Sequence, residues 1–384
     1  MSEVNVALIG YQFMGKAHSN AYRQVRHFFP GKLVPRLKVI CGRNQPALEA
    51  AARQFGWEET ETDWRRAIER DDIDIVDIAT PGYLHHPMAL AAAAAGKHII
   101  CEKPLANNLA EAREMLHAVK KAGVAHMVMH NYSKLPAMVY LKNLVDEGRF
   151  GTVRHYRGSY LQDWIINPQF PLVWRLVKKL TGSGALGDIG SHVVDLAHFL
   201  NGPITSVVSQ MTTFIKERPL PGIGAGAWGA KGQKGKGKVT VDDDTNFLGQ
   251  FKNGSVGVFE ASRFCGGRRN FNIVEIYGSK GSASFNLERM NEIELYDGTE
   301  PQSGQGFKTV SVTESVHPYI GAWWPPGHVI GYEHTFVHAM HDFLTAIEKN
   351  RLPSPNFEDA VQDHFVMDAI ERSAKSKKWE KVRK

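Results

Sequence analysis

The first 129 residues alternate between short apolar runs and segments with helical periodicity, and this order constrains the fold more than any other feature. Apolar runs of strand length predict buried strands, and the segments between them predict helices. The expected strands are 4–9, 37–41, 73–78, 98–101 and 124–129, and the expected helices are 17–25, 45–55, 87–95 and 109–122. Strands that alternate with helices pair in parallel through right-handed crossovers. We therefore expect an α/β fold with a doubly wound parallel sheet.

The pattern changes after about residue 130, where expected strands follow one another with short turns between them. They are 153–160, 204–214, 243–251, 254–261, 270–277, 281–286 and 292–296. Tight turns such as Asn253-Gly254 join neighbouring strands antiparallel, so this part is expected to be α+β with a mostly antiparallel open sheet. Helices are expected at 333–348 and 358–375, the latter with Asn356 as N-cap. The expected domains are residues 1–128 and 129–384, and the C-terminal helices of the second can pack back on the first.

Composition excludes several classes of protein. A chain of 384 residues exceeds the usual size of a single core, which supports two domains. The net charge of +6 is concentrated in residues 372–384, which hold seven basic side chains and one acid, so nucleic-acid and membrane-surface partners are not expected. The three cysteines are scattered, as in a reduced cytoplasmic protein, and no apolar run is long enough to span a membrane. Residues 221–238, with seven glycines and four lysines, are expected to form a flexible surface loop.

A glycine-bearing turn, Gly10 to Gly15, lies between the first expected strand and helix. In a dinucleotide fingerprint the first glycine makes a tight turn, the second lets the backbone approach the pyrophosphate, and the third lets strand and helix pack closely. Gln12 occupies the second position, so the fingerprint is incomplete. Its place between strand and helix still predicts phosphates at the helix N-terminus. The expected contacts are Gly10, Gln12, Phe13, Met14 and Gly15, which makes residues 1–128 a candidate Rossmann domain.

The end of the second strand leaves the choice of cofactor open. It carries Gly42, Arg43 and Asn44, and no acid occurs between residues 31 and 48. An arginine here can pair with the 2′-phosphate of NADP, whereas an acid would bind the ribose of NAD. Alternatively, Arg43 stacks on the adenine and Asn44 binds the ribose, which admits NAD. We expect NAD(H) or NADP(H).

Lys103 lies at the end of the fourth expected strand and is followed by a proline. A lysine in such a place can transfer protons if burial or neighbours lower its pKa. Far downstream, Asp188 and His192 are four residues apart, so one helical face can present both. The structural alternatives are a solvated lysine, a structural histidine and a helix N-cap at Asp188.

The order of these motifs resembles the Gfo/Idh/MocA family of sugar and inositol dehydrogenases. The resemblance rests on Gly10 to Gly15, Thr80-Pro81 followed by His85, Glu102-Lys103-Pro104, and residues 187–195, and it covers essentially the whole chain. Residues 13–19 and 160–164 resemble the branch that includes levoglucosan dehydrogenases and sugar 3-dehydrogenases. The resemblance implies NAD(P)-dependent oxidation or reduction of a secondary hydroxyl of a sugar, glycoside or cyclic polyol by hydride transfer.

The resemblance also implies roles for individual residues. Lys103 would accept or donate the proton, His192 would bind the reacting hydroxyl or share the proton relay, and Asp188 would orient the lysine or another hydroxyl. Further cofactor contacts would be Thr80, Pro81, His85, Glu102, Lys103, Asn131, Trp174 and Arg175. Substrate contacts would be Lys103, Tyr132, Gln162, Asp163, Trp164, Asp188 and His192. No metal is expected, because no clustered set of ligands has the required spacing.

Two other functions stay open at this point. One is redox-neutral chemistry, in which a retained NAD makes a transient keto-sugar for glycoside cleavage or epimerisation. The other is a regulator that senses a dinucleotide or sugar without catalysis. The expected partner is a small sugar or polyol substrate, and the second domain's sheet is expected to form a homo-dimer or homo-tetramer.

Overall fold

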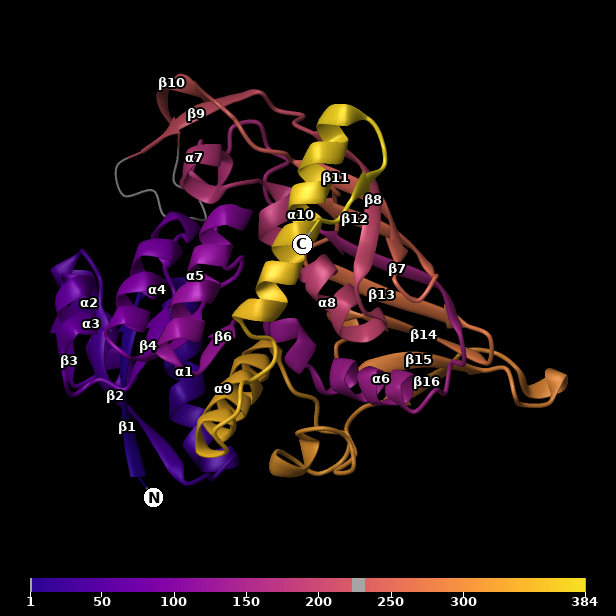
Figure 1. Cartoon of the computed structure of the whole chain (residues 1–384), viewed down its shortest axis with the longest axis horizontal. Coiled ribbons are helices and arrows are strands. Elements are labelled where there is room, and N and C mark those ends of the chain that lie inside the picture. Colours follow the sequence, from indigo (N-terminus) through magenta and orange to yellow (C-terminus); the bar gives the residue numbers. More distant parts are fainter. Residues whose placement is uncertain (1, 223–231, 384) are drawn as a thin grey trace. The chain divides into compact units, whose positions relative to one another are not determined.

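The computed structural model describes residues 2–222 and 232–383, which form two compact units (Figure 1). Unit 1 comprises Met1–Leu135 and Tyr319–Val361. Unit 2 comprises Pro136–Pro318 and Gln362–Lys384. The expected boundary after residue 128 lies near the end of the first segment of unit 1, and the second segment brings a C-terminal helix into that unit.

Unit 1 is built on a parallel sheet of six strands in the order β3-β2-β1-β4-β5-β6. The strands are β1 (Ser2–Ile9), β2 (Leu33–Cys41), β3 (Glu59–Glu61), β4 (Ile75–Ile78), β5 (His98–Cys101) and β6 (His126–Val128). The short strands β4 and β6 are buried along their whole length, as expected for the middle layer of a doubly wound fold. The predicted parallel sheet is therefore confirmed.

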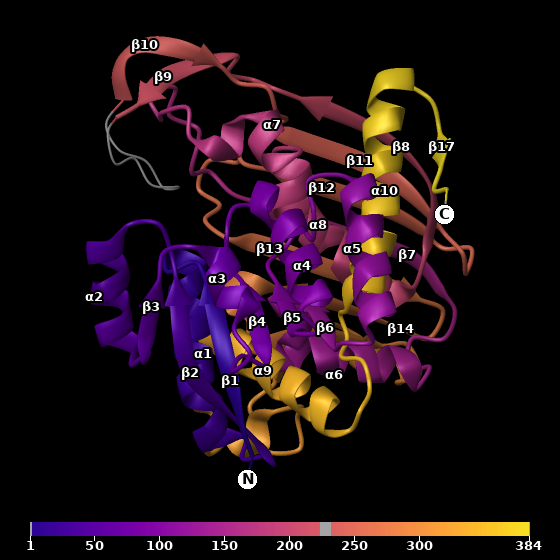
Figure 2. The ribbon, with the colours of Figure 1, turned by 60° about the vertical axis from the view of Figure 1, so that its left-hand side comes forward.

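Helices complete unit 1, and Figure 2 shows α4 and α5 beside the strands of its sheet. They are α1 (Phe13–Phe28), α2 (Gln45–Phe55), α3 (Trp64–Glu69), α4 (His85–Ala94), α5 (Leu109–Ala122) and α9 (Tyr332–Glu348), with the single turns η1 (Gly82–Leu84), η2 (Asn131–Lys134) and η7 (Ile320–Ala322). The last helix of unit 1, α9, packs against α1. The expectations missed β3 and α3, because three and six residues are too few for a hydrophobic period to emerge.

Unit 2 is built on a nine-stranded sheet in the order β16-β15-β14-β13-β7-β12-β11-β8-β17. The strands are β7 (Val153–Leu161), β8 (Ile204–Thr212), β11 (Asp244–Phe251), β12 (Val256–Ser262), β13 (Phe271–Gly278), β14 (Gly281–Asn286), β15 (Glu292–Asp297), β16 (Lys308–Ser311) and β17 (Glu380–Lys381). Every neighbouring pair is antiparallel except β7 and β12. The predicted mostly antiparallel sheet is confirmed.

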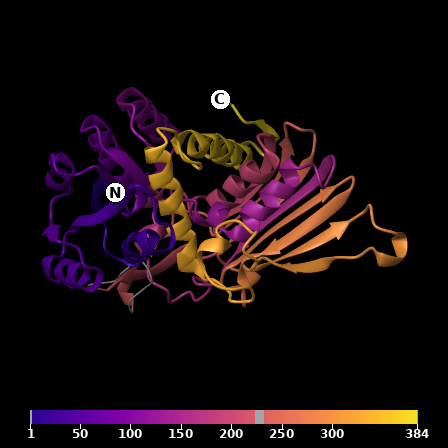
Figure 3. The ribbon, with the colours of Figure 1, turned by 90° about the horizontal axis from the view of Figure 1, so that it is seen from below.

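Figure 3 shows helices of unit 2 along one face of this sheet, where α8 contacts β7 and β12 and α6 packs against α8. The helices of unit 2 are α6 (Pro136–Asp146), α7 (Lys178–Thr181), α8 (Ser191–Asn201) and α10 (Phe357–Ser376), with the short turns η3 (Trp174–Leu176), η4 (Leu186–Gly190), η5 (Leu287–Arg289) and η6 (Gln302–Gly304). Gly158 lets α8 approach the sheet, since a Cβ atom there would lie 3.1 Å from Val193 Cγ1. Asn356 caps α10 as predicted, because its Oδ1 accepts from the backbone N–H of Glu358 at 2.7 Å.

The expected flexible loop at 221–238 is wrong for part of its length. Strand β9 (Glu217–Pro221) pairs antiparallel with β10 (Gly232–Lys238), whereas residues 223–231 lie outside the described part of the chain. Backbone pairing needs no apolar side chains, so a glycine- and lysine-rich segment can still form a strand. The hairpin is anchored by Arg218, whose buried guanidinium donates to the backbone oxygens of Ile165 and Asn167. Among the described residues, no helix combines the length and apolar character needed to cross a membrane.

Candidate functional site

The glycine turn of unit 1 explains why an incomplete fingerprint suffices. Gly10 has a φ of +119°, and a Cβ atom there would lie 2.3 Å from the carbonyl oxygen of Ala79. A Cβ atom on Gly15 would lie 2.1 Å from the carbonyl oxygen of Gly10, so both positions require glycine. Gln12 has a φ of −77°, which any residue adopts. Glutamine at the second position therefore costs the turn nothing in backbone strain.

The beginning of α1 has the features of an anion site. The Gln12 side chain makes no capping hydrogen bond, and the first turn carries no acid. Backbone N–H groups and the positive end of the helix dipole together favour phosphate. The turn follows β1, which lies between β2 and β4 where the strand order reverses, and ligands bind at such switch points. The residues present thus fit the pyrophosphate of a dinucleotide.

Gly42, Arg43 and Asn44, the three residues after β2, have different environments. A Cβ atom on Gly42 would lie 2.3 Å from the ring of Tyr11, so the ring would have to move for any other residue. Arg43 is exposed. Asn44 caps α2, because its Oδ1 accepts from the backbone N–H of Ala47 at 3.1 Å. Asn44 therefore has a structural role, and its contact with a ribose stays a prediction, as does that of Arg43.

His85 ties together the two loops that follow β4 and β5. The side chain is buried, with Nε2 2.9 Å from the carbonyl oxygen of Thr80 and Nδ1 3.1 Å from that of Pro104. Burial lowers the pKa of His85. The structure gives His85 a positioning role, and it leaves Thr80 and Pro81, both half-buried, at the strand-end loop where they were expected.

A buried polar network lies next to Lys103, and the sequence analysis did not find it. His18 Nδ1 lies 2.9 Å from both carboxylate oxygens of Asp77, and His18 Nε2 lies 3.0 Å from Glu102 Oε1. Tyr22 donates its hydroxyl to Asp77 at 3.0 Å. The second oxygen of Glu102 accepts from the backbone N–H of Lys103 at 3.1 Å. A chain of hydrogen bonds thus runs from β4 through α1 to the residue before the expected proton acceptor.

The geometry of this network makes His18 an imidazolium. Both ring nitrogens face carboxylates, and both can donate only when both carry a proton. Burial alone would lower the pKa of His18, but the charges and hydrogen bonds of Asp77 and Glu102 outweigh burial and raise it to about 10. The site beside Lys103 therefore contains one buried cation that holds two buried carboxyl groups.

Three aromatic and amide side chains among the expected contacts in unit 1 lie against α9. Phe13 is half-exposed and stacks on Tyr332 with ring centroids 6.3 Å apart. Tyr132 is buried with its ring 6.3 Å from the same tyrosine. Asn131 donates to Thr335 Oγ1 at 2.8 Å, which links η2 to α9. Met14 is partly buried and packs against the apolar core of unit 1, and its expected contact with the cofactor stays a prediction.

In unit 2, Asp188 and His192 occupy neighbouring turns, as their spacing predicts. Asp188 lies in η4, a π-helical turn, and His192 in the first turn of α8. Asp188 is not the N-cap of α8; its two oxygens face Arg175 Nη1 at 3.3 Å and Arg263 Nη1 at 3.7 Å. His192 is buried, and its ring centroid lies 5.9 Å from that of Tyr160. Lys103 belongs to unit 1, so its joint action with this pair stays a prediction.

Gln162 and Asp163, two further expected substrate contacts in unit 2, have different hydrogen-bond partners. Gln162 donates to Asn270 Oδ1 at 3.0 Å and so belongs to a polar group of side chains. Asp163 accepts from the backbone of Gly267 at 3.0 Å and from Arg269 at 3.0 Å, which anchors a loop.

The two tryptophans among the expected contacts are accounted for by packing. Trp164 contacts a small apolar core that contains Ile165, and its ring lies 5.3 Å from that of Phe170. The Trp174 ring lies 4.5 Å below the guanidinium of Arg175, which pairs with Asp188. Their expected contacts with substrate or cofactor stay predictions.

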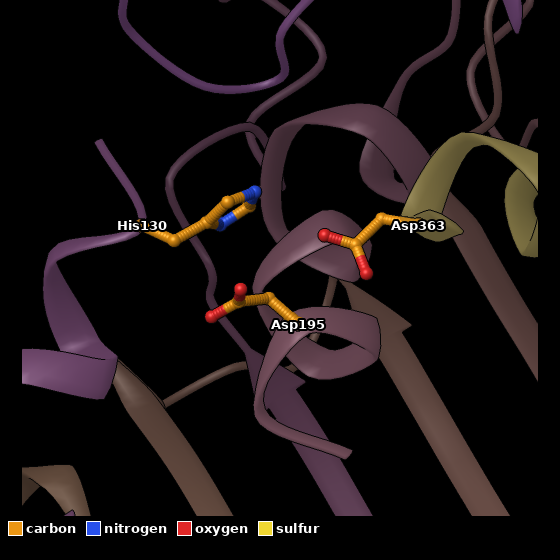
Figure 4. Close-up of side chains that lie close together, drawn as sticks. All are labelled: His130, Asp195 and Asp363. Atoms are coloured by element: carbon orange, nitrogen blue, oxygen red, sulfur yellow. The ribbon is translucent and has the colours of Figure 1, made fainter. Parts of the chain in front are cut away.

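Carboxylates of α8 and α10 lie deeper in unit 2. Figure 4 shows Asp195 on α8 and Asp363 on α10. His198 Nδ1 lies 2.8 Å from Asp363 Oδ1, which ties the two helices together. Asp195 raises the pKa of the buried Tyr156 hydroxyl after the larger effect of burial itself. Asp195 therefore acts on a buried hydroxyl within unit 2.

Comparisons with known proteins cover both units. Residues 4–130 match the family model described as an oxidoreductase family with an NAD-binding Rossmann fold, and residues 138–284 match the GFO/IDH/MocA C-terminal domain. The chain is 45% identical to a levoglucosan dehydrogenase of Pseudarthrobacter phenanthrenivorans over 99% of this chain and 98% of the relative. A levoglucosan dehydrogenase in complex with NADH and L-sorbose superimposes with a TM-score of 0.95 at 43% identity, and an oxidoreductase domain protein of Kribbella flavida with 0.95 at 48%; each pair covers 100% of both chains.

Proposed function

Because the chain belongs to the Gfo/Idh/MocA family of NAD-binding oxidoreductases, we propose that it oxidises a secondary hydroxyl of a sugar or cyclic polyol. The observation that carries the proposal is the placement of Lys103. This lysine follows β5 at the same edge of the parallel sheet as the glycine turn after β1, and its backbone is held by Glu102. The similarity to levoglucosan dehydrogenase over the whole chain supports a sugar as the substrate class.

The chain's own residues have distinct roles in this proposal. The dinucleotide, when bound, supplies the hydride acceptor, and the turn from Gly10 to Gly15 holds its phosphates. Lys103 Nζ takes the hydroxyl proton as the carbon is oxidised, and His192 hydrogen-bonds the same hydroxyl. Asp188, held by two arginines, accepts a hydrogen bond from the lysine or from another hydroxyl.

We propose NAD as the preferred cofactor. The support is the NADH present in structures of levoglucosan dehydrogenase that share this fold and 43% of their residues with this chain. Arg43 is exposed beside Gly42 and can stack on an adenine ring without pairing with a 2′-phosphate. Initial rates with NAD⁺ and NADP⁺ separate the two cofactors directly.

The test is a panel of anhydrosugars, aldoses, glycosides and inositols with each cofactor, followed by absorbance of the reduced nicotinamide. Lys103→Met should lower kcat by roughly a hundredfold or more, because a positioned proton acceptor contributes about 10²–10⁴-fold. NADH affinity is measured by fluorescence in parallel, because Lys103 is also an expected cofactor contact, and kcat at saturating NAD⁺ separates proton transfer from cofactor binding. Lys308→Met, at an exposed lysine of β16, serves as control. Unchanged oxidation by Lys103→Met would overturn the assigned role. Consumption of a sugar without net reduced cofactor would instead support the redox-neutral alternative.

A further inference from the structure

Asn272 is a buried amide that the fold of unit 2 does not use. It lies in β13, its side chain is 1% exposed, and neither Oδ1 nor Nδ2 has a hydrogen-bond partner among the described residues. Such a group destabilises a folded protein unless something else satisfies it. Leucine or valine would fit the pattern better, because Val274 and Ile276 follow on the same face of the strand and are buried.

The sheet register places Asn272 beside residues of the candidate site. Asn272 pairs with Tyr160 of β7, which in turn pairs with Ala261 of β12. The Tyr160 ring faces α8, since its centroid lies 5.9 Å from that of His192. Paired residues share a face of a sheet, so Asn272 also lies on the face that α8 covers.

A second set of polar groups lies just beyond the ends of the same strands. Asn270 Oδ1 accepts from Gln162 Nε2 at 3.0 Å and from the Tyr160 hydroxyl. These bonds fix the orientation of the Asn270 amide, which lies two residues before Asn272. Arg263, which directly follows β12, is fully buried and faces Asp188 at 3.7 Å. One end of this sheet face therefore carries fixed polar groups, with Asn272 as a member that lacks an internal partner.

We propose that Asn272 binds a vicinal diol of the polyol substrate, with Oδ1 accepting from one hydroxyl and Nδ2 donating to its neighbour. The amide offers an acceptor and two donors at fixed spacing, which matches two adjacent hydroxyls of a sugar ring. The bonds between Gln162, Asn270 and Tyr160 hold the surface on which the ring lies. This inference rests on the proposed polyol substrate and adds a residue that determines which polyols bind.

The test uses Asn272→Leu, which keeps the side-chain size and removes the polar atoms. Asn246→Leu, at an exposed position of β11, is the matched control. For an active polyol, KM of Asn272→Leu should rise roughly ten- to hundredfold, as expected for the loss of two neutral hydrogen bonds. The melting temperature without ligand should be equal to or higher than that of the wild type, and NADH affinity should be unchanged.

A substrate series makes the assignment sharper. For deoxy analogues that lack one hydroxyl of the diol, the ratio of KM between Asn272→Leu and wild type should fall toward one. An unchanged KM, or a lowered melting temperature with an unchanged KM, would show that the amide has a structural role only and would overturn the proposal. If Asn272→Leu does not fold, Asn272→Ser is measured in the same way. A wild type inactive on every polyol would instead overturn the proposed function, so the two failures are distinguishable.

Discussion

The His18 network predicts a specific loss of stability at alkaline pH. The pKa of His18 is about 10 in the folded protein, against an ordinary value of 6.5, because Asp77 and Glu102 outweigh the effect of burial. A raised folded pKa stabilises the protein fully below pH 6.5, and this stabilisation is lost as the pH rises toward 10. One pKa unit corresponds to about 1.4 kcal/mol, so the whole contribution is about 5 kcal/mol. Between pH 7 and pH 9 the loss is about 2–3 kcal/mol.

The assay is the free energy of unfolding from urea titrations at half-unit pH steps from 6 to 9.5, for wild type and His18→Gln. Cysteines and tyrosines also titrate in this range; burial, with smaller contributions from Glu61 and Asp63, raises the pKa of Cys41 to about 12. Those groups are common to both proteins, so the difference between the two curves reports His18 together with the two carboxyl groups that it pairs with. The difference should shrink by about 2–3 kcal/mol from pH 7 to pH 9. A difference that stays constant over this range would refute the imidazolium assignment.

Two further predictions follow from the geometry of unit 1. Gly10→Ala should weaken NADH binding at least tenfold and destabilise the fold by about 1–2 kcal/mol or more, because φ is +119° and a Cβ atom meets the Ala79 carbonyl. Gly96→Ala, where φ is also positive but a Cβ atom has open space, is the control, and equal NADH affinity of both variants would contradict the argument. His338 accepts from Trp323 Nε1 at 2.8 Å and is held neutral, and burial lowers its pKa to about 3. A lowered pKa gives stability that is present above pH 6.5 and lost as the pH falls toward 3, so His338→Gln should flatten the acid limb of the urea-derived stability curve.

Local signals predicted the parts of the site that one segment determines. The glycine turn, the lysine at the strand end and the four-residue spacing of Asp188 and His192 all depend on neighbours in the sequence, and the structure places them on the expected elements. The membership of α9 in unit 1 depends on its packing against α1, which lies more than 300 residues earlier in the sequence. Hydrophobic periodicity shows that α9 has an apolar face and leaves its partner undetermined.

The residues that the sequence analysis missed share a signal that was available. Asp77 is an acid inside a strand that is otherwise apolar, and Asn272 is an amide at an inward position of an otherwise apolar face. A buried carboxylate needs a cation or several donors, whereas a buried amide needs hydrogen bonds, so each such residue predicts a partner without naming it. The fold supplies the partner of Asp77 from α1, as His18. For Asn272 the described residues supply none, and that difference separates a polar group that holds the site in place from one that binds a ligand.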